Sequence, residues 1–205
     1  MVKEQERSQT RRERILDAAV AVFTRKGYRD AGMEDIAGEA ETSKGGLYFH
    51  FPSKQALFLR LLERTSTLLI DRTEAAIADE PDPIACAETA LHVVLQTFAS
   101  HRGLTRLFLV EAMGAGPEFH ATMLDIHTRF TALIAHHLDE AVRQGAIPPL
   151  DADLAAQVWF GALNEVVTRW ALAEKPGRLE DTYPALRTLL LRSIGVAEGA
   201  TFTHP

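Results

Sequence analysis

Apolar residues recur at three- and four-residue steps along almost the whole of this 205-residue chain, which is the spacing of one face of an α-helix. The first such stripe ends at Gly27, and a glycine commonly follows the last turn of a helix. No segment alternates between apolar and polar residues for long enough to predict a β-strand. We therefore expect an all-α fold of about nine helices, at residues 11–27, 33–40, 43–50, 53–79, 84–101, 104–113, 118–144, 154–173 and 180–194.

Two of the expected helices are short and follow each other closely. Residues 33–40 and 43–50 are joined by the turn Glu41-Thr42-Ser43, and Ser43 is a typical N-cap for the second of them. Two helices joined in this way form a helix-turn-helix. The second helix of such a unit can enter the major groove of DNA with its N-terminal residues leading. The spacing therefore indicates a DNA-binding unit.

The second short helix begins with an unusual sequence, SKGGLYFH at residues 43–50. Two glycines in the first turn cost about 1 kcal/mol each relative to alanine. Close approach is one reason to keep them, because backbone amides without side chains can come near a phosphate or a base edge. Lys44 would add charge there, and Tyr48 would offer its hydroxyl to a phosphate. Leu47 and Phe51 are expected to anchor the helix in the core.

These residues also carry a family resemblance. The stretch GYRDAGMEDIAGEAETSKGGLYFHFPSKQALF, residues 27–58, resembles the DNA-binding domain of the tetracycline-repressor (TetR) family, and Phe23 fits the same pattern. The resemblance implies a homodimeric repressor whose two recognition helices read a palindromic operator in double-stranded DNA. The residues implied to bind DNA are Thr42, Ser43, Lys44, Gly45, Gly46, Tyr48 and His50, with Lys54 on a phosphate.

Three details leave alternatives open. Family members usually place Ser or Thr before the helix at 33–40, where this chain has Ala31-Gly32, so we expect no DNA contact there. His50 has a second interpretation as a cap of its own short helix. The basic residues Arg11, Arg12 and Arg14 are either an ordinary solvated face or an auxiliary DNA contact.

The distribution of charge indicates two regions with different partners, and the low cysteine content indicates a reducing compartment. Residues 1–54 hold 10 Lys and Arg against 9 Asp and Glu, whereas residues 55–205 hold 12 against 19. Cys86 is the single cysteine, which excludes an intrachain disulfide. The N-terminus lacks the apolar core of a signal peptide, and no apolar run approaches a membrane span. We expect a cytoplasmic protein without a membrane partner.

The domains follow from these observations. We expect a helix-turn-helix DNA-binding domain at residues 1–54, a helical effector-binding and dimerisation domain at 55–196, and a poorly ordered tail at 197–205. Effector pockets are mainly apolar and oriented by a few polar groups. Side chains of that mixture interrupt the later helices, although each can also be plain core. The candidate ligand-binding residues are Phe98, Arg106, Leu107, Phe108, Glu111, Met123, His127, Phe130, Trp159, Phe160, Asn164 and Trp170.

The effector class comes from resemblance alone. Residues 106–119 and 160–181 resemble a TetR branch that responds to fatty acyl-CoA thioesters or related lipids. This implies a small hydrophobic effector, with a fatty acyl-CoA favoured, that releases the repressor from DNA. The arginines available for its phosphates are Arg102, Arg106, Arg129 and Arg169. The alternative is a drug-like or aromatic effector in efflux or catabolic control.

The last two long helices supply a candidate dimer interface. Their apolar and small residues suit a four-helix contact between protomers, although an intramolecular core is the alternative. The residues are Val158, Gly161, Ala162, Val166, Leu186, Leu189, Leu190 and Ile194. Other function classes have less support. The chain has no Gly-rich phosphate loop, no metal-ligand set and no G-x-S-x-G elbow, so we expect no enzyme, no catalytic residues, no metal site and no cofactor. A ligand-free architectural DNA-binding protein is the remaining alternative.

Overall fold

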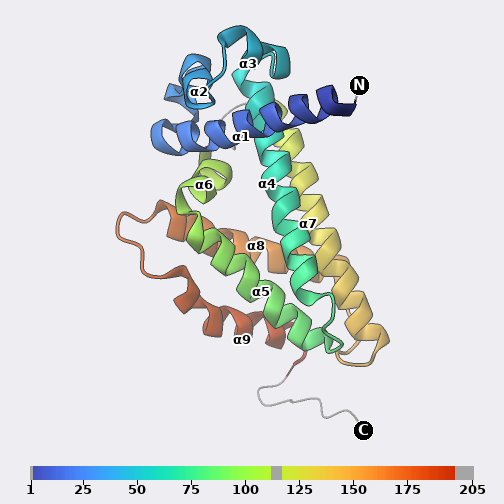
Figure 1. Cartoon of the computed structure of the whole chain (residues 1–205). Helices are drawn as coiled ribbons and strands as arrows, with labels where there is room; N and C mark the ends of the chain where they lie inside the picture. Colours follow the sequence, from blue (N-terminus) through green and yellow to red (C-terminus); the bar gives the residue numbers. More distant parts are fainter. Residues whose placement is uncertain (1, 112–116, 197–205) are drawn as a thin grey trace. The chain divides into compact units, whose positions relative to one another are not determined.

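The structure, a computed structural model, describes the backbone of residues 2–111 and 117–196 and the side chains of residues 8–110 and 119–196 (Figure 1). Within these ranges the chain is helical and contains no strand, as the apolar periodicity predicts. Its nine α-helices in the described ranges are α1 Val2–Asp30, α2 Met33–Glu39, α3 Lys44–His50, α4 Lys54–Ile77, α5 Pro83–Ser100, α6 Arg102–Arg106, α7 Pro117–Arg143, α8 Ala152–Leu172 and α9 Tyr183–Ser193.

The chain forms two compact units. Unit 1 comprises Met1–Ser66 and Gly103–Thr122, and unit 2 comprises Thr67–Arg102 and Met123–Pro205. The division falls within α4 and α7, so each of these helices contributes to both units. The expected DNA-binding domain at residues 1–54 lies wholly in unit 1, which also takes the first part of α4 and residues 103–122.

Helix α1 starts earlier than the sequence predicts, at Val2, but its regular part ends where expected. Gly27 has φ 79° and ψ 162°, a conformation in the region that favours glycine. The helix buries one apolar face, on which Ile15, Val22 and Phe23 are fully covered. This face is the stripe that predicted the helix.

The two short helices have the expected boundaries and anchors. Ser43 caps α3, because its Oγ accepts a hydrogen bond of 3.1 Å from the Gly46 amide. Leu47 and Phe51 are buried, as predicted. Gly32 takes the N-cap position of α2, and its amide donates to Oδ2 of Asp35 at 3.0 Å. A Ser or Thr at this position would accept a bond from an amide inside the helix, which Gly32 cannot do, so α2 keeps only the reciprocal bond from the cap amide to Asp35.

An aromatic cluster joins elements of unit 1 that are distant in sequence. The ring of Phe58 in α4 lies 5.3 Å from Phe23, 4.7 Å from Tyr28, 5.5 Å from Phe119 and 6.1 Å from Phe108, between ring centroids. Edge and tilted contacts of this kind are favourable in addition to the apolar area that they bury. They explain why residues 103–122 belong to unit 1.

Helix α6 approaches α1 closely at one glycine. A Cβ placed on Gly103 would lie 2.4 Å from Cγ2 of Thr24, far below normal contact. Only glycine therefore fits this position in the present packing.

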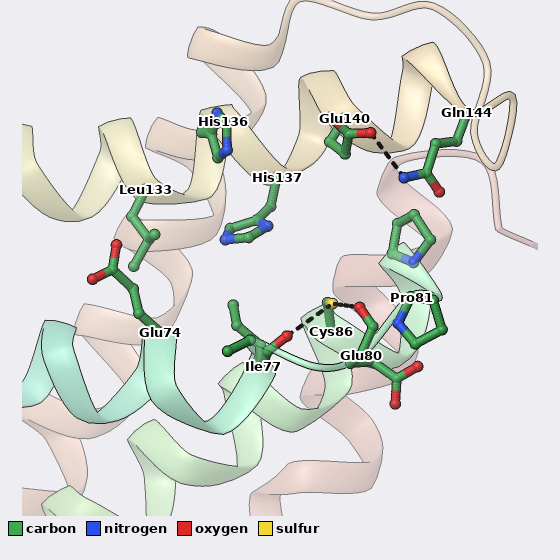
Figure 2. Close-up of a pocket in the computed structure, with 12 residues that line it drawn as sticks. Glu74, Ile77, Glu80, Pro81, Cys86, Leu133, His136, His137, Glu140 and Gln144 are labelled. Atoms are coloured by element: carbon green, nitrogen blue, oxygen red, sulfur yellow. Dashed lines mark hydrogen bonds between the residues drawn. The ribbon is translucent and has the colours of Figure 1, made fainter.

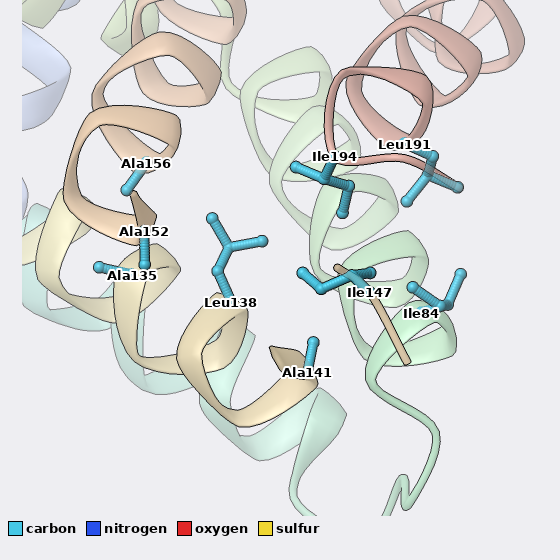
Figure 3. Packing of buried hydrophobic residues seen from close by; sticks show 9 residues of the cluster. All are labelled: Ile84, Ala135, Leu138, Ala141, Ile147, Ala152, Ala156, Leu191 and Ile194. Carbon is cyan, nitrogen blue, oxygen red and sulfur yellow. The ribbon is translucent and has the colours of Figure 1, made fainter. Parts of the chain in front are cut away.

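Unit 2 is held by a core between α5, α7, α8 and α9 (Figure 3). Asp82 and Asp151 cap α5 and α8 by accepting the amides of Ile84 and Leu154 at 2.9 and 3.0 Å. The buried cluster consists of Ile84, Ala135, Leu138, Ala141, Ile147, Ala152, Ala156, Leu191 and Ile194.

Two expected helices differ from the prediction. The helix expected at 104–113 is divided into α6 and a π-helical segment, η1 Leu107–Glu111. The helix expected at 180–194 is a 3-10 turn, η3 Leu179–Thr182, followed by α9. Pro184 lies in the first turn of α9 and lacks the amide that would continue the earlier turn. The expected break at 114–117 lies largely outside the described residues, as does the tail at 197–205.

Candidate nucleic-acid interface and effector region

The exposed surface of α3 is the candidate nucleic-acid interface. Lys44 and Gly45 are exposed at its N-terminal end, Tyr48 is 41% exposed and Phe49 is 82% exposed. Thr42 and Ser43 precede them in the turn. The residues expected at 42–48 thus lie on α3 and on the turn that precedes it, within unit 1.

The amide of Gly46 takes part in the N-terminal cap of α3. Its amide is occupied by Ser43, and a Cβ at this position would lie 2.8 Å from Oγ1 of Thr42. Gly45 differs, because an added Cβ would meet nothing within 4 Å in the described structure. Close approach to DNA therefore remains an explanation for Gly45, while at Gly46 an added Cβ would also require the Thr42 hydroxyl to move.

Lys44 forms an ion pair with a residue of α2. Its Nζ lies 2.6 Å from Oε1 of Glu34, and the hydrogen bond and charge of Lys44 lower the pKa of Glu34. Both side chains are exposed, and exposed ion pairs contribute little net stability. A DNA phosphate can therefore replace Glu34 as the partner of Lys44 at small cost.

His50 is half-buried at the end of α3. Burial lowers its pKa most, and the charges of Arg11 and Arg12 lower it further. The lowered pKa favours the neutral imidazole, which can donate or accept a hydrogen bond. Its ring lies 5.2 Å from that of Phe49.

Lys54 is bound within the protein. Its Nζ donates to the carbonyl oxygens of Tyr28, Arg29 and Ala31 at 2.8, 2.9 and 2.9 Å. It also lies 4.9 Å from the centroid of the Tyr28 ring. All three of its donors are thus engaged at the end of α1, and a phosphate contact by Lys54 stays a prediction.

Phe49 is exposed on α3 but is not among the residues that the sequence predicts to bind DNA. Helical spacing contained the signal, since Leu47 and Phe51 lie four residues apart on the buried face and the residue midway between them must point elsewhere. A flat apolar ring exposed beside Tyr48 is suited to contact with a nucleic-acid surface.

The expected ligand-binding residues are divided between the units. Arg106, Leu107 and Phe108 lie in unit 1, while the side chain of Glu111 lies outside the described residues. The other eight lie in unit 2: Phe98, Met123, His127, Phe130, Trp159, Phe160, Asn164 and Trp170.

Within unit 2, part of this set forms an aromatic group. His127 and Phe130 of α7 lie 4.7 and 6.1 Å from Phe160 of α8, between ring centroids, and all three side chains are half-buried. Burial lowers the pKa of His127. Met123 and Leu107 are buried in the cores of their units instead.

The two tryptophans have partners in their own unit. Trp159 donates to Oγ of Ser193 at 3.0 Å, and Trp170 donates to the carbonyl oxygen of Gly177 at 2.9 Å. The guanidinium of Arg102 lies 5.6 Å from the Trp170 ring.

A separate cavity of about 420 Å³ lies in unit 2 between α4, α5 and α7 (Figure 2). Its walls carry the carboxylates Glu74, Glu80 and Glu140, and none of the expected ligand-binding residues lines it. These carboxylates would repel the phosphates of a CoA thioester. Cys86 faces the cavity, where its Sγ lies 3.2 Å from the carbonyl oxygen of Glu80 and burial raises its pKa.

The expected dimer residues need one correction. Leu186, Leu190 and Ile194 are buried inside their own protomer, because α9 packs against α5. Val158 and Leu189, by contrast, are 55% and 67% exposed, and Gly161 is exposed on the same helix as Val158. Ala162 and Val166 are half-buried. The free apolar surface thus belongs to one face of α8 and to Leu189.

Two further kinds of feature are absent from the described residues. Among the side chains that are described, no group of three or more His, Cys, Asp or Glu is arranged to hold a metal ion. None of the described helices is both long and apolar enough to cross a membrane.

Two family models match the chain. The model of bacterial regulatory proteins of the tetR family matches residues 15–61. The model of the tetracyclin repressor-like C-terminal domain matches residues 82–173. The two matches fall on the helix-turn-helix region and on most of the later helices.

Individual relatives agree with these models. The chain is 26% identical over 166 residues to the fatty acid metabolism regulator protein of Bacillus subtilis, across 78% of this chain and 84% of the relative. It is 28% identical over 180 residues to the HTH-type transcriptional regulator TtgR of Pseudomonas putida, across 82% and 83%. Both relatives are named as regulators, the second of them as a regulator of transcription.

A solved structure shares the fold. The transcriptional regulator FadR from Bacillus subtilis, crystallised in complex with stearoyl-CoA, matches with a TM-score of 0.82 at 24% identity. The match covers 89% of this chain and 98% of that chain.

Proposed function

Because the chain belongs to the tetR family of bacterial regulatory proteins, we propose that it is a homodimeric repressor that binds a palindromic operator and is released by a small hydrophobic effector. A protein that acts on chromosomal DNA in this way works in the cytoplasm. The observation that carries the DNA-binding part is the exposed surface of α3, where Lys44 and Tyr48 follow a capped turn.

The DNA-binding part is tested with an operator that the protein itself selects. Wild-type protein enriches duplexes from a random-sequence library, and affinity for the enriched palindrome is measured by fluorescence anisotropy. Lys44→Ala removes a charge-assisted contact, so we expect at least a tenfold loss of affinity. Lys175→Ala, at an exposed lysine of the loop after α8, is the matched control and should bind as wild type does. Failure to enrich any sequence would overturn the proposal.

The effector part favours a fatty acyl-CoA. One relative regulates fatty acid metabolism, and one structure of the same fold was solved with stearoyl-CoA. In unit 2, the half-buried rings of His127, Phe130 and Phe160 offer apolar contact area for an acyl chain.

Arg102 is the cation best suited to an anionic group of such an effector. Its guanidinium donates to the carbonyl oxygens of Ala171 and Ala173, and its buried Nε has no hydrogen-bond partner among the described residues. Buried donors normally have partners, so an anion at this position would satisfy the group. Arg169 is less available, because it is paired with Glu165.

The effector is tested by native mass spectrometry of gently purified protein and by thermal shifts with acyl-CoA thioesters of increasing chain length. Stearoyl-CoA should raise the melting temperature and release the operator, whereas butyryl-CoA and unacylated CoA should do so weakly. Arg102→Gln should weaken the response, and Arg72→Gln, at an exposed arginine of the same unit, should not. Indifference to the whole series would exclude acyl-CoA and favour a drug-like or aromatic effector.

The homodimer is assigned to α8 and α9. Val158 and Leu189 expose apolar side chains that a second copy can cover, and two DNA-reading units must be held about 34–36 Å apart to bind successive half-sites. Leu189→Glu should give monomers in sedimentation equilibrium. Leu124→Glu is the matched control, because Leu124 is equally exposed at 67% but lies on α7. A Leu189→Glu protein that stays dimeric would remove this face from the interface.

A further inference from the structure

Most cations near the helix-turn-helix are already engaged by groups of the same chain. Arg11, Arg12 and Arg29 of α1 differ, since all three are exposed and none forms an ion pair with a described carboxylate, and of these only Arg11 and Arg12 are adjacent. Two adjacent like charges repel each other when no described carboxylate pairs with them, so this arrangement favours an external anion. The engaged cations are Arg14, Arg25, Lys26, Lys44 and Arg64, on carboxylates, and Lys54, on carbonyls.

Of these arginines, Arg12 lies beside the end of α3. The guanidinium carbon of Arg12 is 5.5 Å from the centroid of the Phe51 ring, and Phe51 is the C-cap of α3. A cation over an aromatic face is attracted to it, which holds this arginine in place. The charges of Arg11 and Arg12 also act on His50, whose pKa they lower. The Arg12 guanidinium therefore lies beside the helix assigned to DNA, and Arg11 is its neighbour on α1.

We propose that Arg11 and Arg12 bind the phosphate backbone of DNA next to the segment that α3 occupies. A guanidinium group matches the geometry of a phosphate and can donate two parallel hydrogen bonds to it. Duplex DNA presents one negative charge per about 1.7 Å of its axis, so two neighbouring arginines can each find a phosphate. Such a contact adds affinity and fixes orientation, but it does not read sequence. The inference rests on the proposed DNA-binding function.

The contact has a specific signature in the dependence of binding on salt. Each phosphate contact contributes about 0.9 to the slope of log K against log salt concentration. The variant Arg11→Ala/Arg12→Ala should therefore flatten the slope by about 1.8 per protomer bound, or about 3.6 for a dimer. The loss should be equal on the enriched palindrome and on a random duplex of the same length, so the ratio of the two affinities should not change.

Two further variants separate this contact from general effects of charge. Arg11→Lys/Arg12→Lys keeps both charges and should restore most of the slope. Arg72→Ala/Arg178→Ala removes the same charge from exposed arginines of unit 2 and should keep the wild-type slope. In the free protein, the pKa of His50, measured by NMR titration, should be higher in Arg11→Ala/Arg12→Ala than in the wild type, since two positive charges near the imidazole are lost.

The outcomes distinguish the inference from the function on which it rests. In one outcome the wild-type protein binds DNA, while the slope of log K against log salt concentration is the same in the Arg11→Ala/Arg12→Ala and control variants. That result overturns the phosphate contact alone. An unchanged His50 titration overturns the placement of the arginines beside α3. A wild-type protein that binds no duplex overturns both the proposed function and this inference.

Discussion

The close approach of α6 to α1 at Gly103 gives a quantitative prediction. Gly103→Ala would place a carbon atom 2.4 Å from Cγ2 of Thr24, whereas carbon atoms in contact are about 3.5–4.0 Å apart. The contact must open by more than about 1 Å, and overpacking of this kind costs about 1–3 kcal/mol. Replacing a helical glycine by alanine stabilises the helix by about 1 kcal/mol, which offsets part of this cost. The free energy of unfolding should therefore fall by about 1 kcal/mol.

Thr24→Ser isolates the steric part, because it removes only the methyl group that the new Cβ would meet. In this background Gly103→Ala should be neutral or should stabilise the protein by up to about 1 kcal/mol. The four proteins are compared by urea unfolding at one fixed concentration, since the proposed dimerisation would link stability to concentration. The coupling energy should be about 1–3 kcal/mol. Equal effects of Gly103→Ala in both backgrounds would refute the packing argument.

Two further predictions concern Lys54 and His127. Lys54→Met removes three hydrogen bonds from a charged donor to carbonyl oxygens at the end of α1, so the free energy of unfolding measured in urea should fall by about 2 kcal/mol. A flatter salt dependence of DNA binding, with stability unchanged, would instead assign Lys54 to a phosphate. Burial lowers the folded-state pKa of His127 below 6.5, so the unfolded state binds more protons below that pH and stability should fall as the pH drops through it. His127→Phe should reduce the drop in melting temperature between about pH 7.5 and pH 5.5, and an unchanged drop would contradict the assignment.

The helices and their caps could be predicted because they depend on nearby residues. The apolar stripe of α1 and the cap at Ser43 are set by side chains within a few positions of one another, and both are found where the sequence places them. The π-helical segment after α6 could not be predicted. Its apolar pattern is the same as that of an ordinary helix, and its contacts, such as that of Phe108 with Phe58, join residues that are far apart in sequence.

The site could be predicted as a segment but not as a set of contacts. The sequence identifies Lys44 and Lys54 as cations of the reading region, yet their partners lie 10 or more positions away and are fixed by tertiary structure. The same limit applies to the dimer residues. An apolar stripe shows that one face of α9 is covered, but not whether its own protomer or a second copy covers it.

The burial of Cys86 has a practical consequence for measuring motion. Thiol reagents attack exposed thiolates, and this thiol is 7% exposed with a raised pKa. A cysteine introduced on the surface would therefore be the one reactive thiol of an otherwise unaltered protein. Gly38 in α2 is exposed, and a Cβ there would meet nothing within 4 Å in the described structure. Two spin labels attached through Gly38→Cys in a dimer would report the separation of its two α2 helices, and so of its helix-turn-helix units, in solution before and after an effector is added.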